Sequence, residues 1–488
     1  MDTPGRPGGT RDARAAGTAQ RNARIQRFIL PRKLVLLGLV PALLLLAGCG
    51  GGGSGGGVIT SSTGNGSGSG GSHAANTVAM TVDSGPNGND VDTPFITVTL
   101  CAPGSTTNCQ QIDHVEVDTG SYGLRVMSSV LSSTLASALQ QEQAGANGTS
   151  VVECTQFADG FSWGPVKLAD VQVAGETASN VPTQVIGDPA YMASSGTTSE
   201  IPTTCSSNGP EEDTVATFGA NGIIGIGPFG ADCGSLCATS VNGGTNPGWY
   251  YGCPASGWSP TNPCNEIAVT DAGQVTNPVV FFQTDNNGVI VEFPSAAQGA
   301  STLTGTLVFG IGTESNNSLG GQTVLTADSS YGDVNTDYTT VNGTPQYLPF
   351  SYFDTGSNAY YFSDDGIPSL QGCSTYTGYN SKSPDSWFCP ASELNRNAVN
   401  SGQNGAQSTV YFSIGNAYTI FNSSAGTVFS DLGASAGSQL TDCASPASAS
   451  QDTSCGFDFG LPFFLGRNVY IAFAGANTAW GNGPYYAY

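Results

Sequence analysis

The chain has 488 residues, with 36 Asp and Glu against 13 Lys and Arg and a formal net charge of −23 at neutral pH. This balance excludes nucleic acid as a partner, because the phosphate backbone is bound by basic surfaces. Histidine-based catalysis is also disfavoured. Of the two histidines, His73 lies in a Gly/Ser-rich segment, and we expect a structural role for His114 on a predicted strand.

The first 48 residues predict an export signal. Eight of the 13 basic residues lie within residues 1–33, and an apolar run over residues 34–47 comes next. The sequence Leu-Ala-Gly-Cys at residues 46–49 resembles the lipobox of bacterial lipoproteins, which implies cleavage before Cys49 and acylation of its thiol. Gly50 then favours an outer-membrane location, on either the periplasmic or the cell-surface face. A single membrane span is the alternative, although the apolar run is short for one.

Residues 49–78 are nearly all Gly, Ser, Thr and Asn, which predicts a flexible tether. Loss of residues 1–48 removes eight basic and two acidic residues and leaves five basic against 34 acidic ones. Such a charge suits an enzyme that works in acid and equally suits any soluble exported surface. The chain beyond the tether is longer than one ordinary core supports, so we expect two lobes, at residues 79–290 and 291–488.

The tetrapeptide Asp-Thr-Gly-Ser occurs twice, at residues 118–121 and 354–357, each time directly after a run that predicts a strand. Its glycine allows a tight turn, and its hydroxyls can bond the neighbouring backbone or the carboxylate. Two such loops face to face would bring Asp118 and Asp354 so close that both cannot ionise together. The pair would hold one proton, so that one member acts as a base and the other as an acid.

The loops and their flanks resemble the bilobal pepsin-like aspartic peptidases. The first loop continues with Leu124-Arg125-Val126 and is similar to the family's Asp-Thr-Gly-Ser-x-x-Leu-Trp-Val. Residues 156–164 with 171–173 resemble its flap hairpin and the strand after it, and residues 221–227 resemble the segment that supports the first catalytic loop. Residues 306–310 and 460–473 are similar to second-lobe strands, where either Gly460 or Gly466 fills the matching supporting role.

The resemblance implies an all-β, bilobal pepsin-like double β-barrel with an active-site cleft between the lobes. It implies that Asp118 and Asp354 are catalytic and that Ser121 and Ser357 bond their outer oxygens. The other positions that it assigns are the loop residues Thr119, Gly120, Thr355 and Gly356 and the flap residues Phe157 and Gly160. It implies no cofactor and no metal, a peptide or protein substrate, and a monomer. Membrane attachment through Cys49 is implied separately, by the lipobox-like sequence.

Two residues depart from the family pattern. The flap tyrosine aligns with Phe157, which lacks the hydroxyl, and the tryptophan that usually partners it aligns with Arg125. The sequence therefore predicts an exported aspartic endopeptidase, with a catalytically inactive surface lipoprotein that binds a peptide or glycan as the alternative. The signal, the two loops and the C-terminal residues also resemble a bacterial lipoprotein family of unknown function.

Twelve cysteines remain after Cys49, and an even set in an exported chain predicts disulfides. We expect three local pairs, Cys101–Cys109, Cys373–Cys389 and Cys443–Cys455. A further group could hold zinc in principle, but its Gly/Pro-rich setting favours disulfides: Cys233, Cys237, Cys253 and Cys264. Short β-rich runs predict strands, including residues 95–100, 171–173, 279–282 and 469–473, and one helix is expected over residues 128–144.

Overall fold

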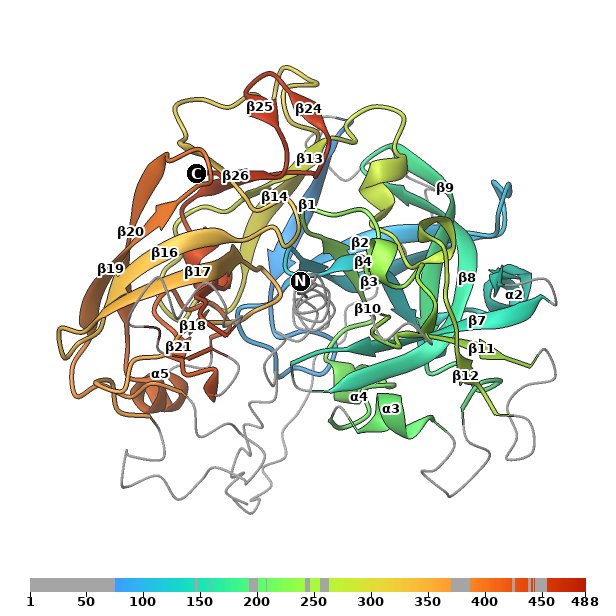
Figure 1. Ribbon diagram of the computed structural model, residues 1–488, viewed down its shortest axis with the longest axis horizontal. Helices are drawn as coiled ribbons and strands as arrows, with labels where there is room; N and C mark the ends of the chain where they lie inside the picture. Colours follow the sequence, from blue (N-terminus) through green and yellow to red (C-terminus); the bar gives the residue numbers. More distant parts are fainter. Residues whose placement is uncertain are drawn as a thin grey trace, which may run out of the picture.

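The computed structural model describes residues 75–488 except 145–147, 159, 193–200, 208, 242–245, 255–262, 370–386, 424–425, 438–439, 442 and 444–453. The predicted signal segment, Cys49 and His73 lie outside the described residues. Within the described part the protein is all-β, as predicted, and its helices are short (Figure 1).

Twelve strands lie before residue 270. They are β1 Thr77–Val82, β2 Pro94–Cys101, β3 Cys109–Asp118, β4 Tyr122–Met127, β5 Gln140–Gln141, β6 Gln143–Ala144, β7 Thr149–Gln156, β8 Phe161–Val173, β9 Glu176–Ile186, β10 Gly222–Ile226, β11 Tyr250–Cys253 and β12 Asn265–Glu266.

The remaining strands belong to the second half. They are β13 Gly288–Glu292, β14 Leu303–Phe309, β15 Val324–Thr326, β16 Val334–Thr339, β17 Pro345–Phe353, β18 Tyr360–Tyr361, β19 Leu394–Ser401, β20 Gln407–Ile414, β21 Gly433–Ala434, β22 Asp458–Phe459, β23 Asn468–Ala472, β24 Asn477–Thr478, β25 Gly481–Asn482 and β26 Tyr485–Ala487.

Helices fill the connections. The α-helices are α2 Ser133–Ala138, α3 Thr203–Ser206, α4 Val215–Phe218, α5 Ala417–Ser423 and α7 Leu461–Phe464, and the 3-10 helices are η1 Ser128–Val130, η2 Gly234–Leu236, η4 Asp271–Gly273 and η5 Pro278–Phe281. No helix within the described residues is long and apolar enough to cross a bilayer.

Each Asp-Thr-Gly-Ser loop leaves a strand that has a parallel neighbour. In the first half, β10 pairs in parallel with β3 and antiparallel with β4, the strands that enter and leave the first loop. In the second half, β22 pairs in parallel with β17 and antiparallel with β18, which flank the second loop. Because both loops are enclosed in this way, their backbones are fixed by sheet pairing on either side.

Strands from both ends of the chain share one sheet. β1 pairs with β14 along its whole length, β14 pairs with β13, and β13 pairs with β23. These strands lie between the first-half strands and the sheet that contains β16 to β20 (Figure 1). β1 begins at Thr77, within the last residues of the predicted tether, and the expected lobe boundary at residue 290 falls inside β13.

Two predicted elements are wrong. The helix expected over residues 128–144 is reduced to η1 and α2, because the chain turns extended at Leu139 and β5 then pairs with β8. The strand expected over residues 279–282 is instead the 3-10 helix η5. Pro278 stands in its first turn, and the side chain of Asn277 caps it by accepting a hydrogen bond from the Val279 amide at 3.0 Å.

The described residues contain five complete disulfides. The predicted pairs Cys101–Cys109 and Cys443–Cys455 are confirmed. The four cysteines weighed as a zinc site instead form Cys233–Cys237 and Cys253–Cys264. Cys154–Cys205 ties β7 to α3, and Cys389 is also disulfide-bonded while its predicted partner Cys373 lies outside the described residues. This disulfide content indicates folding in an oxidising compartment.

Candidate active site

The threonines of the two loops brace each other across the site. The Thr119 hydroxyl donates to the Phe353 carbonyl at 2.8 Å and accepts from the Thr355 amide at 3.0 Å. In the reciprocal half, the Thr355 hydroxyl donates to the Val117 carbonyl at 2.6 Å and accepts from the Thr119 amide at 3.2 Å. All four bonds are buried, so they hold the two loops in one fixed relation.

This brace brings the predicted aspartates together. A methyl group built on Gly120 would lie 2.4 Å from the Asp354 carboxyl carbon, and one built on Gly356 would lie 2.7 Å from that of Asp118. Each carboxyl therefore lies over the glycine of the opposite loop, and no larger residue fits at either position. Asp118 and Asp354 are only 1% and 2% exposed.

The aspartates interact electrostatically. Burial raises the pKa of Asp354 well above its ordinary range, and the negative charges of Asp118 and Asp458 and the contact with the Asp118 carboxyl raise it further. The Gly356 amide, which donates to Asp354 Oδ1 at 2.7 Å, opposes this only in part. Two carboxyls that share one buried space in this way hold one proton between them.

The serines of the two loops differ. Ser357 Oγ lies 3.1 Å from Asp354 Oδ2, as predicted, and 2.6 Å from Oδ2 of a third carboxyl, Asp458. The bond expected between Ser121 and Asp118 is absent, because the Ser121 hydroxyl has no hydrogen-bond partner among the described residues. Asp118 instead accepts from its own loop, through the Gly120 amide at 2.7 Å.

The supporting glycines occupy matching places. Gly225 pairs with Asp118 in the β10–β3 register, and the β22–β17 register brings Gly460 opposite Asp354. A side chain on Gly460 would collide with the carbonyl oxygens of the second loop, at 2.0–2.5 Å. The choice left open by the sequence is therefore resolved for Gly460, since Gly466 lies in a separate turn with a φ of 79°.

The predicted flap is the β7–β8 hairpin, and its tip is held from outside. The Phe157 amide donates to the Gly160 carbonyl at 2.8 Å. The Phe161 amide donates to the Pro210 carbonyl at 3.0 Å, and the Glu212 amide donates to the Phe161 carbonyl at 2.8 Å. The segment before α4 is thus bonded to the hairpin.

The ring of Phe157 is buried and does not extend freely from the hairpin. It is 2% exposed and meets the Phe218 ring edge to face, with the centroids 5.5 Å apart. Met127, Ile186 and Ile223 belong to the same apolar cluster. A tyrosine hydroxyl here would have to find a partner inside that cluster, which accounts for the phenylalanine.

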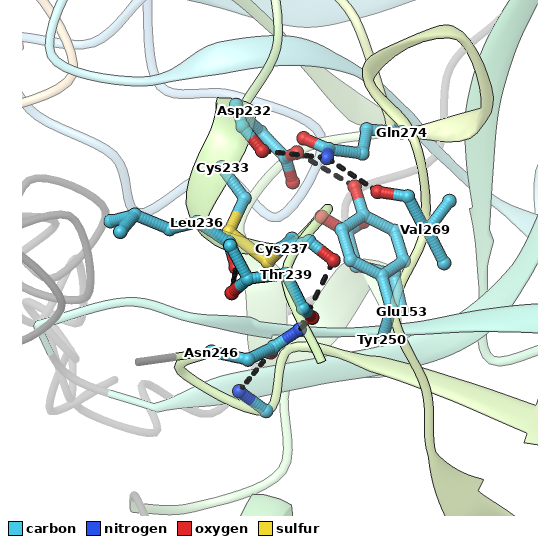
Figure 2. The surroundings of a disulfide bond; sticks show 12 residues. Glu153, Asp232, Cys233, Leu236, Cys237, Thr239, Asn246, Tyr250, Val269 and Gln274 are labelled. Atoms are coloured by element: carbon cyan, nitrogen blue, oxygen red, sulfur yellow. Dashed lines mark hydrogen bonds between the residues drawn. A yellow bond between two sulfur atoms is a disulfide. The ribbon is translucent and has the colours of Figure 1, made fainter. Parts of the chain in front are cut away.

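Arg125 has become the centre of a buried polar network. Its Nη2 donates to Glu153 Oε1 at 2.6 Å and to Asp232 Oδ2 at 3.1 Å, and its Nε donates to Glu153 Oε2 at 3.1 Å. The Tyr250 hydroxyl donates to Asp232 Oδ1 at 2.7 Å. Figure 2 shows these acidic side chains and Tyr250 beside the Cys233–Cys237 disulfide. The guanidinium is fully buried, so these carboxyls balance its charge within the protein.

A pocket of about 430 Å³ borders the first loop. Burial raises the pKa of the Tyr122 phenol, and the charges of nearby acidic groups, Asp118 and Asp354 among them, raise it further. The pocket wall includes Tyr122, Phe229, Asp232, Leu236, Asp271 and Ser330.

Sequence reasoning missed Asp458 and Tyr122. Tyr122 comes directly after the first tetrapeptide and could have been included on that ground. Asp458 stands between two phenylalanines just before Gly460, so the alternation Phe-Asp-Phe was the available signal: one face of a short strand carries aromatic rings and the other a carboxyl.

Comparison with known proteins gives a family without an assigned activity. Residues 72–488 match the model of a family described as proteins of unknown function, DUF3443. The chain belongs to this family. No curated protein matches the sequence. Among solved structures, the chain is similar to the aspartic proteinase from Irpex lacteus, at 15% identity and a TM-score of 0.43, over 84% of this chain and 96% of that one.

Proposed function

We propose that the protein is an aspartic endopeptidase in which Asp118 and Asp354 activate a water molecule. The observation that carries the proposal is the paired loop geometry: two buried carboxyls, each over the glycine of the opposite loop, held by reciprocal threonine bonds. This arrangement supplies one proton acceptor and one proton donor at one point, as hydrolysis of a peptide bond needs.

In this proposal the protonation state of each aspartate determines its role. Asp118 is the carboxylate and takes a proton from the attacking water. Asp354, whose pKa is raised by burial and by neighbouring charge, donates its proton to the substrate carbonyl oxygen. A tetrahedral diol forms. In its collapse Asp118 gives the proton it took from water to the leaving nitrogen, Asp354 takes a proton from a diol hydroxyl, and the C–N bond breaks, which restores both carboxyls. The reaction needs no cofactor or metal at this site.

The test is binding of pepstatin, a statine-type mimic of the tetrahedral state, to the full chain between pH 3 and 7. We expect tight binding in acid that weakens as the pair loses its proton, and loss of binding in Asp118→Asn with the fold retained. No binding by a folded wild-type protein, together with no cleavage of a denatured protein in acid, would reject the proposal.

One observation favours a second candidate, a binding protein without catalysis. The flap tip is bonded to residues 210–212 through the Phe161 amide and carbonyl, and this contact would resist the opening that peptide entry needs. A protein that binds an extended peptide or a glycan but releases no new amino termini from any substrate would support this alternative.

We also propose that the protein is exported and attached to the outer membrane through acylated Cys49. The lipobox-like sequence and the disulfides support this proposal. Mass spectrometry of the mature N-terminal peptide should show lipid on Cys49, and Cys49→Ser should release the protein into the soluble fraction. An unmodified N-terminus upstream of Cys49 would contradict it.

A further inference from the structure

A third buried carboxyl lies beside the aspartate pair. Asp458, at the start of β22, is 0% exposed, and its Oδ2 lies 2.6 Å from the Ser357 hydroxyl. The same hydroxyl lies 3.1 Å from Asp354 Oδ2. Ser357 therefore joins Asp458 to the pair through one oxygen atom.

The distances indicate where the protons lie. A hydroxyl has a single proton, and 2.6 Å is in the range of a hydroxyl that donates to a charged carboxylate. Ser357 then donates to Asp458 and keeps only lone pairs for Asp354. The longer contact to Asp354 Oδ2 is satisfied when that oxygen is protonated and donates to Ser357. Asp354 Oδ1 is not available for the proton, since it already accepts from the Gly356 amide.

The first loop has no counterpart of this arrangement. The residue two positions before the supporting glycine is Asp458 in the second half and Ile223 in the first. Ile223 is fully buried and apolar, and the Ser121 hydroxyl has no hydrogen-bond partner among the described residues. The two halves are thus alike in backbone pairing but differ in the residue at this position.

We propose that Asp458 is a positioning residue that acts through Ser357 to keep the shared proton on Asp354. This makes Asp354 the acid and Asp118 the base, and it extends upward the pH range in which the pair holds its proton. The catalytic consequence rests on the proposed function, whereas the position of the proton does not.

The surroundings of Asp458 fit this role. Tyr352 on β17 and Tyr361 on β18 are its strand partners, and the Tyr361 hydroxyl donates to Asn358 at 2.6 Å. Burial and then the charge of Asp458 raise the pKa of Tyr352, so that its phenol stays neutral. Within the described part of the chain no Lys, Arg or His forms an ion pair with Asp458.

The order of ionisation has a physical cause. Burial raises the pKa of Asp458, the Ser357 hydrogen bond opposes the rise, and the charge of Asp118 adds to it. The pKa of Asp354 is raised by burial and by the charges of both Asp118 and Asp458. Asp354 therefore meets two negative charges, and both oppose the loss of its proton.

The experiment is a carbon-13 NMR titration of the aspartate carboxyls in the folded full chain, with resonances assigned from Asp118→Asn and Asp354→Asn. In the wild type, Asp354 should be the last of the three to titrate. In Asp458→Asn its midpoint should fall by about one pH unit, because a like charge is lost while an acceptor for Ser357 remains. In Asp458→Ile it should fall further, because Ser357 is then free to donate to ionised Asp354.

The matched control is Asp92→Asn, which neutralises another fully buried carboxyl whose hydrogen bond comes from the Phe429 amide. It should leave the Asp354 midpoint unchanged. An unchanged midpoint in both Asp458 variants, or a wild-type order in which Asp118 or Asp458 titrates last, would overturn the proposal. If the shift is present but no variant or wild-type protein cleaves peptides, the peptidase assignment fails while the role of Asp458 stands. If the protein is active, the high-pH limb of the plot of kcat/KM against pH should shift to lower pH in the Asp458 variants, by the same amount as the Asp354 midpoint.

Discussion

Replacing Arg125 with methionine should destabilise the protein strongly at neutral pH and much less in acid. The guanidinium is fully buried and makes two bonds to Glu153, at 2.6 and 3.1 Å, and one to Asp232 at 3.1 Å. Methionine can fill much of the space but has no charge, so Glu153 would become a buried carboxylate without a cation. Breaking a buried ion pair from one side costs about 3–5 kcal/mol.

The pH dependence comes from Glu153. Burial alone would raise its pKa, but the charge of Arg125 and hydrogen bonds, including that from Arg125, outweigh burial and lower it. A carboxyl with a lowered folded pKa stabilises the protein above its unfolded pKa of about 4.3, and this contribution is lost as pH falls through the folded pKa. In the variant, burial would act unopposed, and the penalty would disappear once Glu153 is protonated. The difference between the two proteins should therefore be largest at neutral pH.

The assay is urea unfolding monitored by tryptophan fluorescence, at about pH 3.5 and about pH 7.5. The double variant Arg125→Met/Glu153→Gln is the matched control and should recover most of the loss at neutral pH, because it removes the unpaired charge. An equal loss at both pH values, or a loss below about 1 kcal/mol at neutral pH, would refute the reasoning.

Three further predictions concern the site and its scaffold. Thr119→Val should lower the free energy of unfolding by about 2 kcal/mol or more, because it leaves a buried amide and a buried carbonyl unpaired. Thr119→Ser keeps the hydroxyl and should lower it less. Equal losses for the two variants in calorimetry would show that the brace is unimportant. Gly120→Ala should abolish pepstatin binding, since its methyl would lie 2.4 Å from the opposite carboxyl, and retained binding would contradict the geometry. Replacing both cysteines of a disulfide by alanine should lower the free energy of unfolding by about 4 kcal/mol for Cys154–Cys205 and by about 2.5 kcal/mol for Cys101–Cys109, because the first closes a loop of 51 residues and the second a loop of 8. A larger loss for Cys101–Cys109 in urea unfolding would contradict this estimate.

The paired aspartates could be predicted because their signal is local. Each tetrapeptide comes after a strand, and the order of residues within it specifies a tight turn that presents a carboxyl. The contact between Ser357 and Asp354 and the threonine brace arise from the same pattern, since both loops have the same four residues. The missing Ser121 bond could not be foreseen, because the two loops have the same four residues and their own sequence does not distinguish the two serines.

The errors in secondary structure have a similar cause. Residues 128–144 are rich in helix formers, but the segment after Leu139 gains more from pairing β5 with β8 than from continuing the helix. At residues 279–282 the β-branched and aromatic residues suggested a strand, although Asn277-Pro278 is a helix-start signal that local reading could have used. Avoiding the first error would have required knowledge of the tertiary structure, whereas the second could have been avoided from the local sequence.

From the sequence, Arg125 could be recognised only as an unusual residue at its position, and its charged partners could not be identified. A buried arginine needs carboxylate partners, but its partners lie 28 and 107 residues away, on β7 and before η2. No spacing rule connects such positions. In the structure the guanidinium is not exposed to solvent and lies in a buried network with two acidic side chains and a tyrosine.

The measurement that tests the central claim most directly is digestion of a denatured protein at about pH 4 by the full-length wild type, Asp118→Asn and Asp354→Asn. Mass spectrometry would identify the new peptide termini, and circular dichroism would establish that all three proteins are folded. The account predicts cleavage by the wild type and none by either variant. Equal cleavage by all three, or no cleavage by a folded wild type, would contradict it.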